Sequence, residues 1–105
     1  MKIDKYVLFM PAANAKACKR LNVRPLSAHN IALLYAIKQK PINYSAIMEY
    51  FISIAFDISD TTIHYSLQYL LSIQFIERTG KAYTIAPLGR EYLSLIRRYL
   101  LNKRL

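Results

Sequence analysis

The 105-residue chain contains a single cysteine, Cys18, and only two histidines, His29 and His64. One cysteine excludes a disulfide within the chain, and two histidines are too few partners for it to complete a zinc site. We therefore expect a domain that needs no metal and no other cofactor. The same sparing use of cysteine favours a cytoplasmic protein.

Acidic residues and glycines are also scarce, with six Asp and Glu and two Gly in the whole chain. The acids are scattered rather than paired. No glycine-rich phosphate loop is recognisable, and neither is a set of nucleophile, base and orienting residue. These absences exclude the common catalytic patterns, so we expect a protein that is not an enzyme. The sequence leaves open whether the protein binds a small-molecule effector, because an apolar pocket leaves no motif.

Long apolar runs are missing as well. The longest uncharged run, Thr61–Ile76, contains Thr, His, Ser and Gln, whereas a transmembrane helix needs about 20 predominantly apolar residues. The first residues include Asp4 and are followed by no long apolar block, unlike a signal peptide. We expect no membrane association.

The chain is rich in positive charge and in apolar residues. Fifteen Lys and Arg against six Asp and Glu give a net charge of +9, and 54% of the residues are hydrophobic. A chain of this length can bury one core, and its charge favours a polyanionic partner, with nucleic acid ahead of a membrane surface. One basic cluster near the N-terminus is either a solvated helix face or a second phosphate contact. It consists of Lys16, Lys19, Arg20 and Arg24.

Local signals divide the chain into short elements. Residues 1–25 are expected to be a helical extension, in which Ile3–Met10 is a strand or a buried helical turn and Ala12–Leu21 is a short helix. Ser27 and Asn43 are candidate caps for the next two helices. A polar break then leads into a third helix, whose apolar stripe has the i, i+4, i+7, i+8 spacing of a buried face. The stripe consists of Ile63, Leu67, Leu70 and Leu71.

The C-terminal third predicts a hairpin and a last helix. Phe75–Thr79 and Ala82–Ala86 are β-prone runs separated by Gly80-Lys81, which suits a tight turn. Pro87 then fits the first position of a helix, where its missing N–H costs nothing.

Three helices, a hairpin and a terminal helix in this order resemble the winged helix-turn-helix domain. Ser59–Leu70 is similar to its recognition helix, and Ile73–Arg78 is similar to the following turn and first wing strand. Tyr83–Leu93, with its Pro-Leu-Gly sequence, resembles the second wing strand and the last helix of bacterial regulators of the MarR and PadR kind. The resemblance implies a mainly α fold with a three-helix core, a two-stranded wing and a C-terminal helix. The core would span residues 26–87 and the last helix residues 88–105.

The function that this resemblance implies is sequence-specific binding of double-stranded DNA by a small transcriptional regulator. A helix fits the major groove, where short polar side chains reach base edges and phosphates. The expected DNA contacts lie on the third helix and the hairpin. They are Ser59, Thr61, Thr62, His64, Tyr65, Gln68, Arg78 and Lys81.

The chain departs from the family pattern in three places. Ala86 stands where a capping Thr is usual, Gln74 stands where Gly is usual, and Asp60–Ser72 contains no Lys or Arg. An uncharged recognition face argues against arginine-to-guanine readout. The alternative is therefore a winged helix that contacts another protein and reads no DNA.

The last helix carries more apolar surface than a terminal helix on a small domain needs. We therefore expect a homodimer, formed by this helix. Its expected interface residues are Leu95, Ile96, Tyr99 and Leu100.

Overall fold

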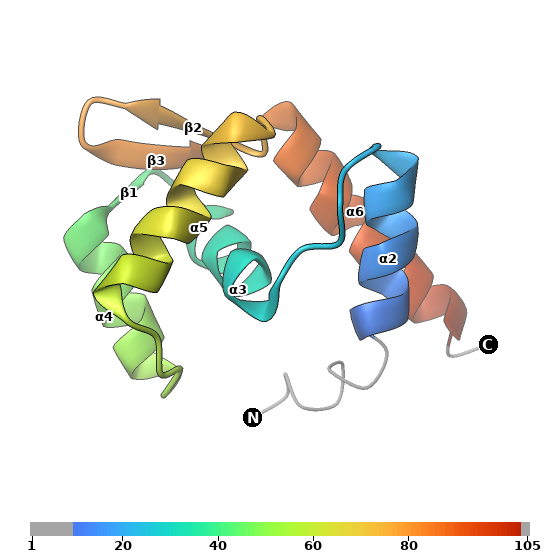
Figure 1. Cartoon of the computed structure of the whole chain (residues 1–105), viewed down its shortest axis with the longest axis horizontal. Helices are drawn as coiled ribbons and strands as arrows, with labels where there is room; N and C mark the ends of the chain where they lie inside the picture. The colour runs from blue at the N-terminus through green and yellow to red at the C-terminus, as the bar shows by residue number, and fades with distance from the viewer. Residues whose placement is uncertain (1–9, 104–105) are drawn as a thin grey trace. The chain divides into compact units, whose positions relative to one another are not determined.

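The computed structural model describes residues 10–103, which form a mainly helical chain with a small antiparallel sheet (Figure 1). The elements are α2 (Met10–Arg20), α3 (Ala28–Ile37), β1 (Ile42–Asn43), α4 (Tyr44–Ser53), α5 (Asp60–Ser72), β2 (Ile76–Thr79), β3 (Ala82–Ile85) and α6 (Pro87–Lys103). The predicted helical and hairpin segments are confirmed at this level. The element predicted at Ile3–Met10 lies outside the described residues, except for Met10, the first residue of α2.

Residue contacts divide the chain into two compact units. One unit is continuous, Ser27–Arg90, and the other combines the N-terminal residues up to Leu26 with those from Glu91 onward. The first turn of α6 thus belongs to the continuous unit and the rest of that helix to the discontinuous unit.

In the continuous unit, α3, α4 and α5 begin at the polar capping residues Ser27, Asn43 and Ser59. Ser27 and Asn30 form a reciprocal capping box, in which each side chain accepts from the other residue's N–H at 3.2 Å. Asn43 Oδ1 accepts from the N–H of Ala46 at 2.9 Å at the start of α4. Each bond satisfies an N–H group that the helix itself leaves without a partner. Both predicted caps, Ser27 and Asn43, are confirmed.

The sheet has three strands in the order β1-β3-β2, all antiparallel. Ile76 pairs with Ile85 across the hairpin, and Gly80 turns the chain with a φ of 62°. The predicted two-stranded wing was incomplete, because β1 adds a third strand through the pairing of Ile42 with Tyr83. A strand of two residues is too short to show the alternation by which strands are recognised.

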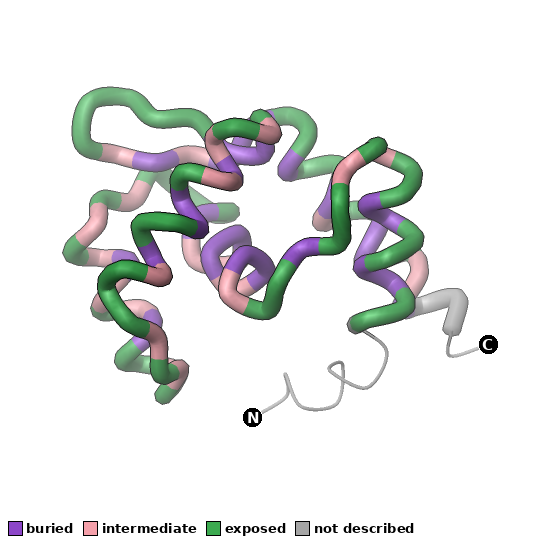
Figure 2. The backbone as a smooth tube through the Cα atoms, in the orientation of Figure 1, coloured by how far each residue is buried: buried purple, intermediate pink, exposed green. Residues whose placement is uncertain are grey.

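The core of this unit is built around α3, which contacts α4, α5 and β3. Figure 2 shows buried positions alternating with exposed ones along α5, as expected for a helix that buries one side. Ile63, Leu67 and Leu70 of the predicted stripe are buried, and Leu71 is half-buried. The largest fully buried side chains of this unit include Phe51 and Phe75.

Three helices end with the same hydrogen-bond pattern, although none of them ends at a glycine. At the end of α5, Gln74 N donates to Leu71 O at 3.1 Å and Phe75 N donates to Leu70 O at 3.0 Å. These paired bonds define a Schellman motif, which requires a left-handed residue just after the helix. Gln74 fills that position with a φ of 63°, and Ala55 after α4 and Asn22 after α2 fill it with φ values of 54° and 63°.

The start of α6 passes very close to the turn that follows α5. The carbonyl oxygen of Phe75 accepts from Ala86 N at 3.0 Å, and a Cβ added to Gly89 would lie 2.1 Å from that same oxygen. The glycine of the Pro-Leu-Gly sequence is therefore required by packing, because any side chain would collide with backbone.

In the discontinuous unit, α2 and α6 are joined by a buried polar cluster. Asn14 Oδ1 accepts from the hydroxyl of Tyr92 at 2.7 Å and from Leu26 N and Cys18 Sγ at 3.3 Å each. Asn14 Nδ2 donates to Leu26 O at 2.8 Å. One amide side chain thus fixes both the chain segment after α2 and the facing side of α6.

The residues expected to form the dimer interface are mostly covered by the chain itself. Leu95, Ile96 and Leu100 are buried, and Tyr99 is half-buried with Lys16 Nζ 5.5 Å from its ring centroid. These three side chains pack in the chain's own core, and their part in a dimer interface stays a prediction. The homodimer itself stays a prediction.

Candidate nucleic-acid interface

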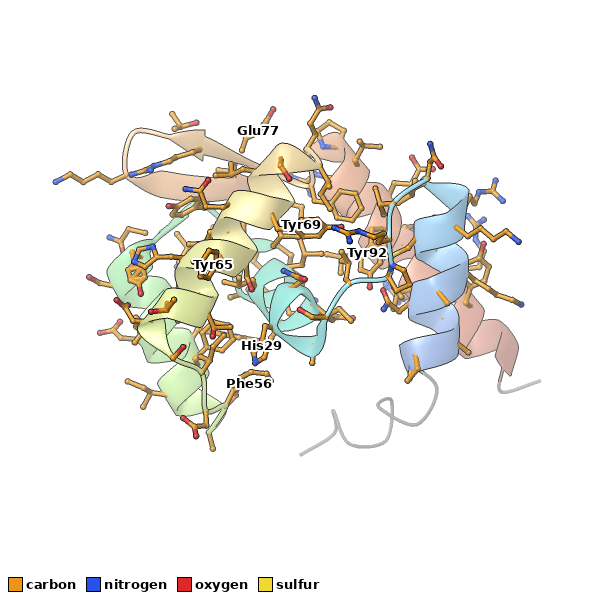
Figure 3. All side chains as sticks on the ribbon, in the orientation of Figure 1. His29, Phe56, Tyr65, Tyr69, Glu77 and Tyr92 are labelled. Atoms are coloured by element: carbon orange, nitrogen blue, oxygen red, sulfur yellow. The ribbon has the colours of Figure 1, made fainter. Side chains whose placement is uncertain are left out.

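The exposed side of α5 carries four of the predicted DNA contacts. Thr61, His64, Tyr65 and Gln68 are all exposed, and 73% of the surface of Tyr65 is accessible (Figure 3). The side chains of three of them, Thr61, Tyr65 and Gln68, make no hydrogen bond within the described part of the chain. Their polar groups are therefore available to a partner.

Two other predicted contacts, Ser59 and Thr62, are used at the start of α5. Ser59 Oγ accepts from Thr62 N at 3.1 Å and lies 2.8 Å from Thr62 Oγ1. Thr62 is half-buried. These hydroxyls cap the helix and bond to each other, which leaves them less free for DNA than sequence reasoning assumed.

His64 belongs to a small cluster that also includes Tyr44 of α4 and Asp60. The rings of His64 and Tyr44 stack with centroids 4.8 Å apart and planes 14° from parallel. His64 Nε2 lies 3.8 Å from Asp60 Oδ2, and the Tyr44 hydroxyl donates to Asp60 Oδ1. The cluster orients the imidazole at the surface by contacts on two sides.

Sequence reasoning missed Tyr44 and Asp60 as part of this surface. Asp60 follows the Ser59 cap, and a carboxylate in the first turn is a recognisable signal because it complements the helix dipole. Its negative charge makes this helix end less favourable to a phosphate. Tyr44 comes from another helix, and no local pattern relates it to His64.

The two hairpin residues, Arg78 and Lys81, are both exposed. Arg78 Nε donates to Gly80 O at 3.1 Å, and its guanidinium lies 5.4 Å from the ring centroid of Tyr83. Arg78 is therefore held against the hairpin with part of its donor set still free, since a guanidinium has five N–H groups. The structure brings the hairpin and α5 together through contacts between β2 and α5.

Positive charge is distributed unevenly between the two units. Residues 27–90 carry five basic side chains, Lys38, Lys40, Arg78, Lys81 and Arg90, against four acidic ones, Glu49, Asp57, Asp60 and Glu77. The described part of the other unit carries seven, Lys16, Lys19, Arg20, Arg24, Arg97, Arg98 and Lys103, against Glu91 alone. The unit that holds α5 and the hairpin is close to neutral. Counting charge segment by segment would have found this in the sequence.

Comparison with models of protein families, with curated proteins and with solved structures finds no match for this chain.

No group of three His, Cys, Asp or Glu side chains within residues 10–103 comes together in a way that could hold a metal ion. Among the helices of this same stretch, none combines the length and the apolar character needed to cross a membrane.

Proposed function

We propose that the chain binds double-stranded DNA as a small transcriptional regulator and that residues 27–90 are its winged helix-turn-helix domain. The order α3, β1, α4, α5, β2, β3 and the start of α6 agrees with the order of elements in that domain. The observation that carries the proposal is the polar, exposed side of α5 beside a hairpin that bears Arg78 and Lys81.

Each free side chain on α5 has a role that suits a DNA groove. The Gln68 amide can form two hydrogen bonds with adenine, a pattern that identifies this base. The Tyr65 hydroxyl suits a phosphate, and Thr61 suits a phosphate or a thymine methyl group. Arg78 and Lys81 would contact the neighbouring backbone. Sequence readout would thus rest on neutral hydrogen-bonding groups.

The alternative function is binding of another protein through the same unit, and one observation favours it. Tyr65 and Ile52 are the two most exposed large hydrophobic side chains in the described residues, at 73% and 75%, and the unit that carries them has nearly balanced charges. Exposed tyrosine and aliphatic groups without strong charge are typical of protein interfaces.

The two functions are separated by a triple variant, Thr61→Ala with Tyr65→Ala and Gln68→Ala. A preferred duplex is first selected from a random pool with the unmodified protein, and binding is then measured by fluorescence anisotropy. Each good base contact is worth about 1–3 kcal/mol of discrimination. We therefore expect the variant to bind the selected duplex at least roughly tenfold more weakly, with little change on random duplex.

The matched control replaces Gln39 and Ser45 with Ala, because both are exposed and lie outside α5. It should bind the selected duplex as the unmodified protein does, and circular dichroism should show equal helicity for all three proteins. Failure of the selection to yield a preferred duplex, or equal affinity of the triple variant, would count against DNA readout and favour the protein partner.

A further inference from the structure

We infer that α2 and the part of α6 from Glu91 onward form a phosphate-binding surface, which holds the backbone of a double-stranded nucleic acid without reading its sequence. The inference rests on the proposed function only for the class of ligand. The surface itself is defined by charges on a different unit from the one that carries α5. We call it the basic surface. It consists of Lys16, Lys19, Arg20, Arg24, Arg97 and Arg98.

All six side chains of the basic surface are exposed. None of them lies within salt-bridge distance of a described carboxylate; the one contact of that kind among the described residues joins His64 Nε2 to Asp60 Oδ2. Glu91 is the one acidic residue in the described part of this unit. Among the described residues the positive charge therefore has no ion-pair partner, as expected for a surface that meets a polyanion.

The basic residues of α2 and α6 belong to one packed body. Lys16, Lys19 and Arg20 follow the i, i+3, i+4 spacing that places residues on one side of a helix. The hydrogen bond between Tyr92 and Asn14 and the contact of Lys16 with the Tyr99 ring fix α2 against α6. Figure 3 shows nitrogen-tipped side chains projecting from both helices.

A purely structural role accounts for only part of this charge. Lys19 and Arg20 lie in the last turn of α2, where cations complement the helix dipole. Arg97 and Arg98 lie before the last turn of α6 and make no salt bridge with a described carboxylate. Mutual repulsion among the six groups opposes folding of the unit, so the charges are better explained by a ligand than by stability.

A duplex nucleic acid fits this surface better than an anionic membrane does. Helices that bind membranes place an apolar face in the lipid. Here the apolar sides of the two helices are buried in the chain, at Ala13, Ala17, Leu95 and Ile96 among others. The large hydrophobic side chains that are exposed in the described residues, Ile52, Tyr65 and Leu88, all belong to the other unit. Within residues 11–26 and 91–100 no large apolar side chain is exposed, so what this part of the unit offers a ligand is positive charge, which suits a phosphate backbone.

The inference assigns affinity and sequence readout to different units. The basic surface would supply the salt-dependent part of binding, and the α5 face would select among sequences. Such a division explains how a recognition helix without Lys or Arg can act on DNA, since backbone contacts position a protein and base contacts specify the site.

The test uses two double variants of the full chain, Lys19→Gln with Arg20→Gln and Arg97→Gln with Arg98→Gln. The matched control, Lys38→Gln with Lys40→Gln, removes the same number of charges from the other unit. Binding to a labelled random-sequence duplex is measured by anisotropy across a salt series. Each lost phosphate contact lowers the slope of log affinity against log salt by about 0.9.

We expect each double variant to lower that slope by up to about 1.8 and to weaken binding roughly tenfold or more at low salt. The control should change both quantities much less. A charge-preserving variant, Lys19→Arg with Arg20→Lys, should retain binding, and thermal melts followed by circular dichroism verify that every variant is folded.

The outcomes separate this inference from the proposed function. One outcome would support the basic surface and reject readout by α5. In it, the double variants lose duplex affinity, whereas the α5 triple variant binds the selected duplex as tightly as the unmodified protein. Double variants that bind like the control would overturn the basic surface, even if the α5 triple variant lost its selected duplex. Weak duplex binding by the unmodified protein, combined with tight binding to phosphatidylserine and phosphatidylcholine vesicles through these residues, would also overturn it.

Discussion

Gly89 and Gly80 show that two glycines can be required for different reasons. A Cβ at Gly89 would lie 2.1 Å from Phe75 O and 2.9 Å from the Ile85 side chain, whereas a Cβ at Gly80 would meet nothing within 4 Å. Gly80 instead has a φ of 62°, a left-handed conformation that side chains disfavour. Gly89 is required because a side chain would have no space, and Gly80 is required for its backbone conformation.

We expect Gly89→Ala to lower the free energy of unfolding by about 1–3 kcal/mol, the usual cost of overpacking, despite the better helix propensity of Ala. Gly80→Ala is the matched comparison and should cost about 1 kcal/mol through backbone strain alone. Urea unfolding followed by circular dichroism measures both. A Gly89→Ala protein that is as stable as the unmodified protein, or more stable, would show that α6 does not pack against Phe75 as described.

Single residues also show what sequence reasoning can and cannot find. Ser27 and Asn43 were recognisable as caps, because a cap acts within three residues of itself. Asn14 was not recognisable, because its partner Tyr92 lies 78 positions away and only the folded chain brings them together. On α5, exposure was correctly expected for Tyr65 and Gln68, whereas the internal bond between Ser59 and Thr62 was not.

At the scale of elements, the ends of α4 and α5 carry backbone strain. Ala55 and Gln74 occupy left-handed positions that Gly fills in most Schellman motifs. A left-handed conformation costs a non-glycine residue roughly 1–2 kcal/mol. The chain therefore holds these turns in place at the expense of stability.

We expect Ala55→Gly and Gln74→Gly each to raise the free energy of unfolding by about 0.5–1 kcal/mol, because relief of the left-handed strain exceeds the added freedom of the unfolded chain. Thermal melting measures the change. The control is Ala15→Gly at an exposed position inside α2, which should cost about 1 kcal/mol instead. A loss of stability at both helix ends would contradict the assigned backbone conformation.

The elements themselves were predictable where apolar spacing repeats over several turns, as in α5, or where turn chemistry is strong, as at Gly80. β1 was missed because two residues carry no period. The contact of α6 with α2 was also missed. Its apolar side was therefore assigned to a second copy, whereas Leu95 and Ile96 are buried within the chain.

At the scale of the whole molecule, three buried or half-buried groups are expected to lower the free energy of unfolding at alkaline pH. Desolvation raises the pKa of the Cys18 thiol, against a smaller lowering by a hydrogen bond with the Leu26 backbone. Desolvation also raises the pKa of Tyr35, with a further contribution from Tyr50, and it raises the pKa of Tyr50 itself. Each group holds its proton more tightly in the folded chain than in the unfolded chain.

Rising pH therefore lowers the free energy of unfolding through these groups. Above the ordinary thiol pKa of 9.0 the unfolded chain releases the Cys18 proton first, so rising pH favours unfolding. We expect the free energy of unfolding to be constant with respect to this group below about pH 8 and to fall as the pH rises through 9 and beyond. Urea unfolding between pH 7 and 10 measures the fall, and Cys18→Ala should make it shallower. Parallel curves for the two proteins would contradict burial of the thiol.

The buried hydrogen bond between Asn14 and Tyr92 also bears on the order in which the chain acquires its structure. Residues 27–90 are continuous, so they can assemble as soon as they have left the ribosome. α2 is synthesised earlier, yet its polar cluster is completed only by a residue that follows almost the whole continuous unit. During synthesis the apolar side of α2, which includes Ala13 and Ala17, therefore stays uncovered until α6 has emerged from the ribosome. The earliest helix described is thus among the last to be buried.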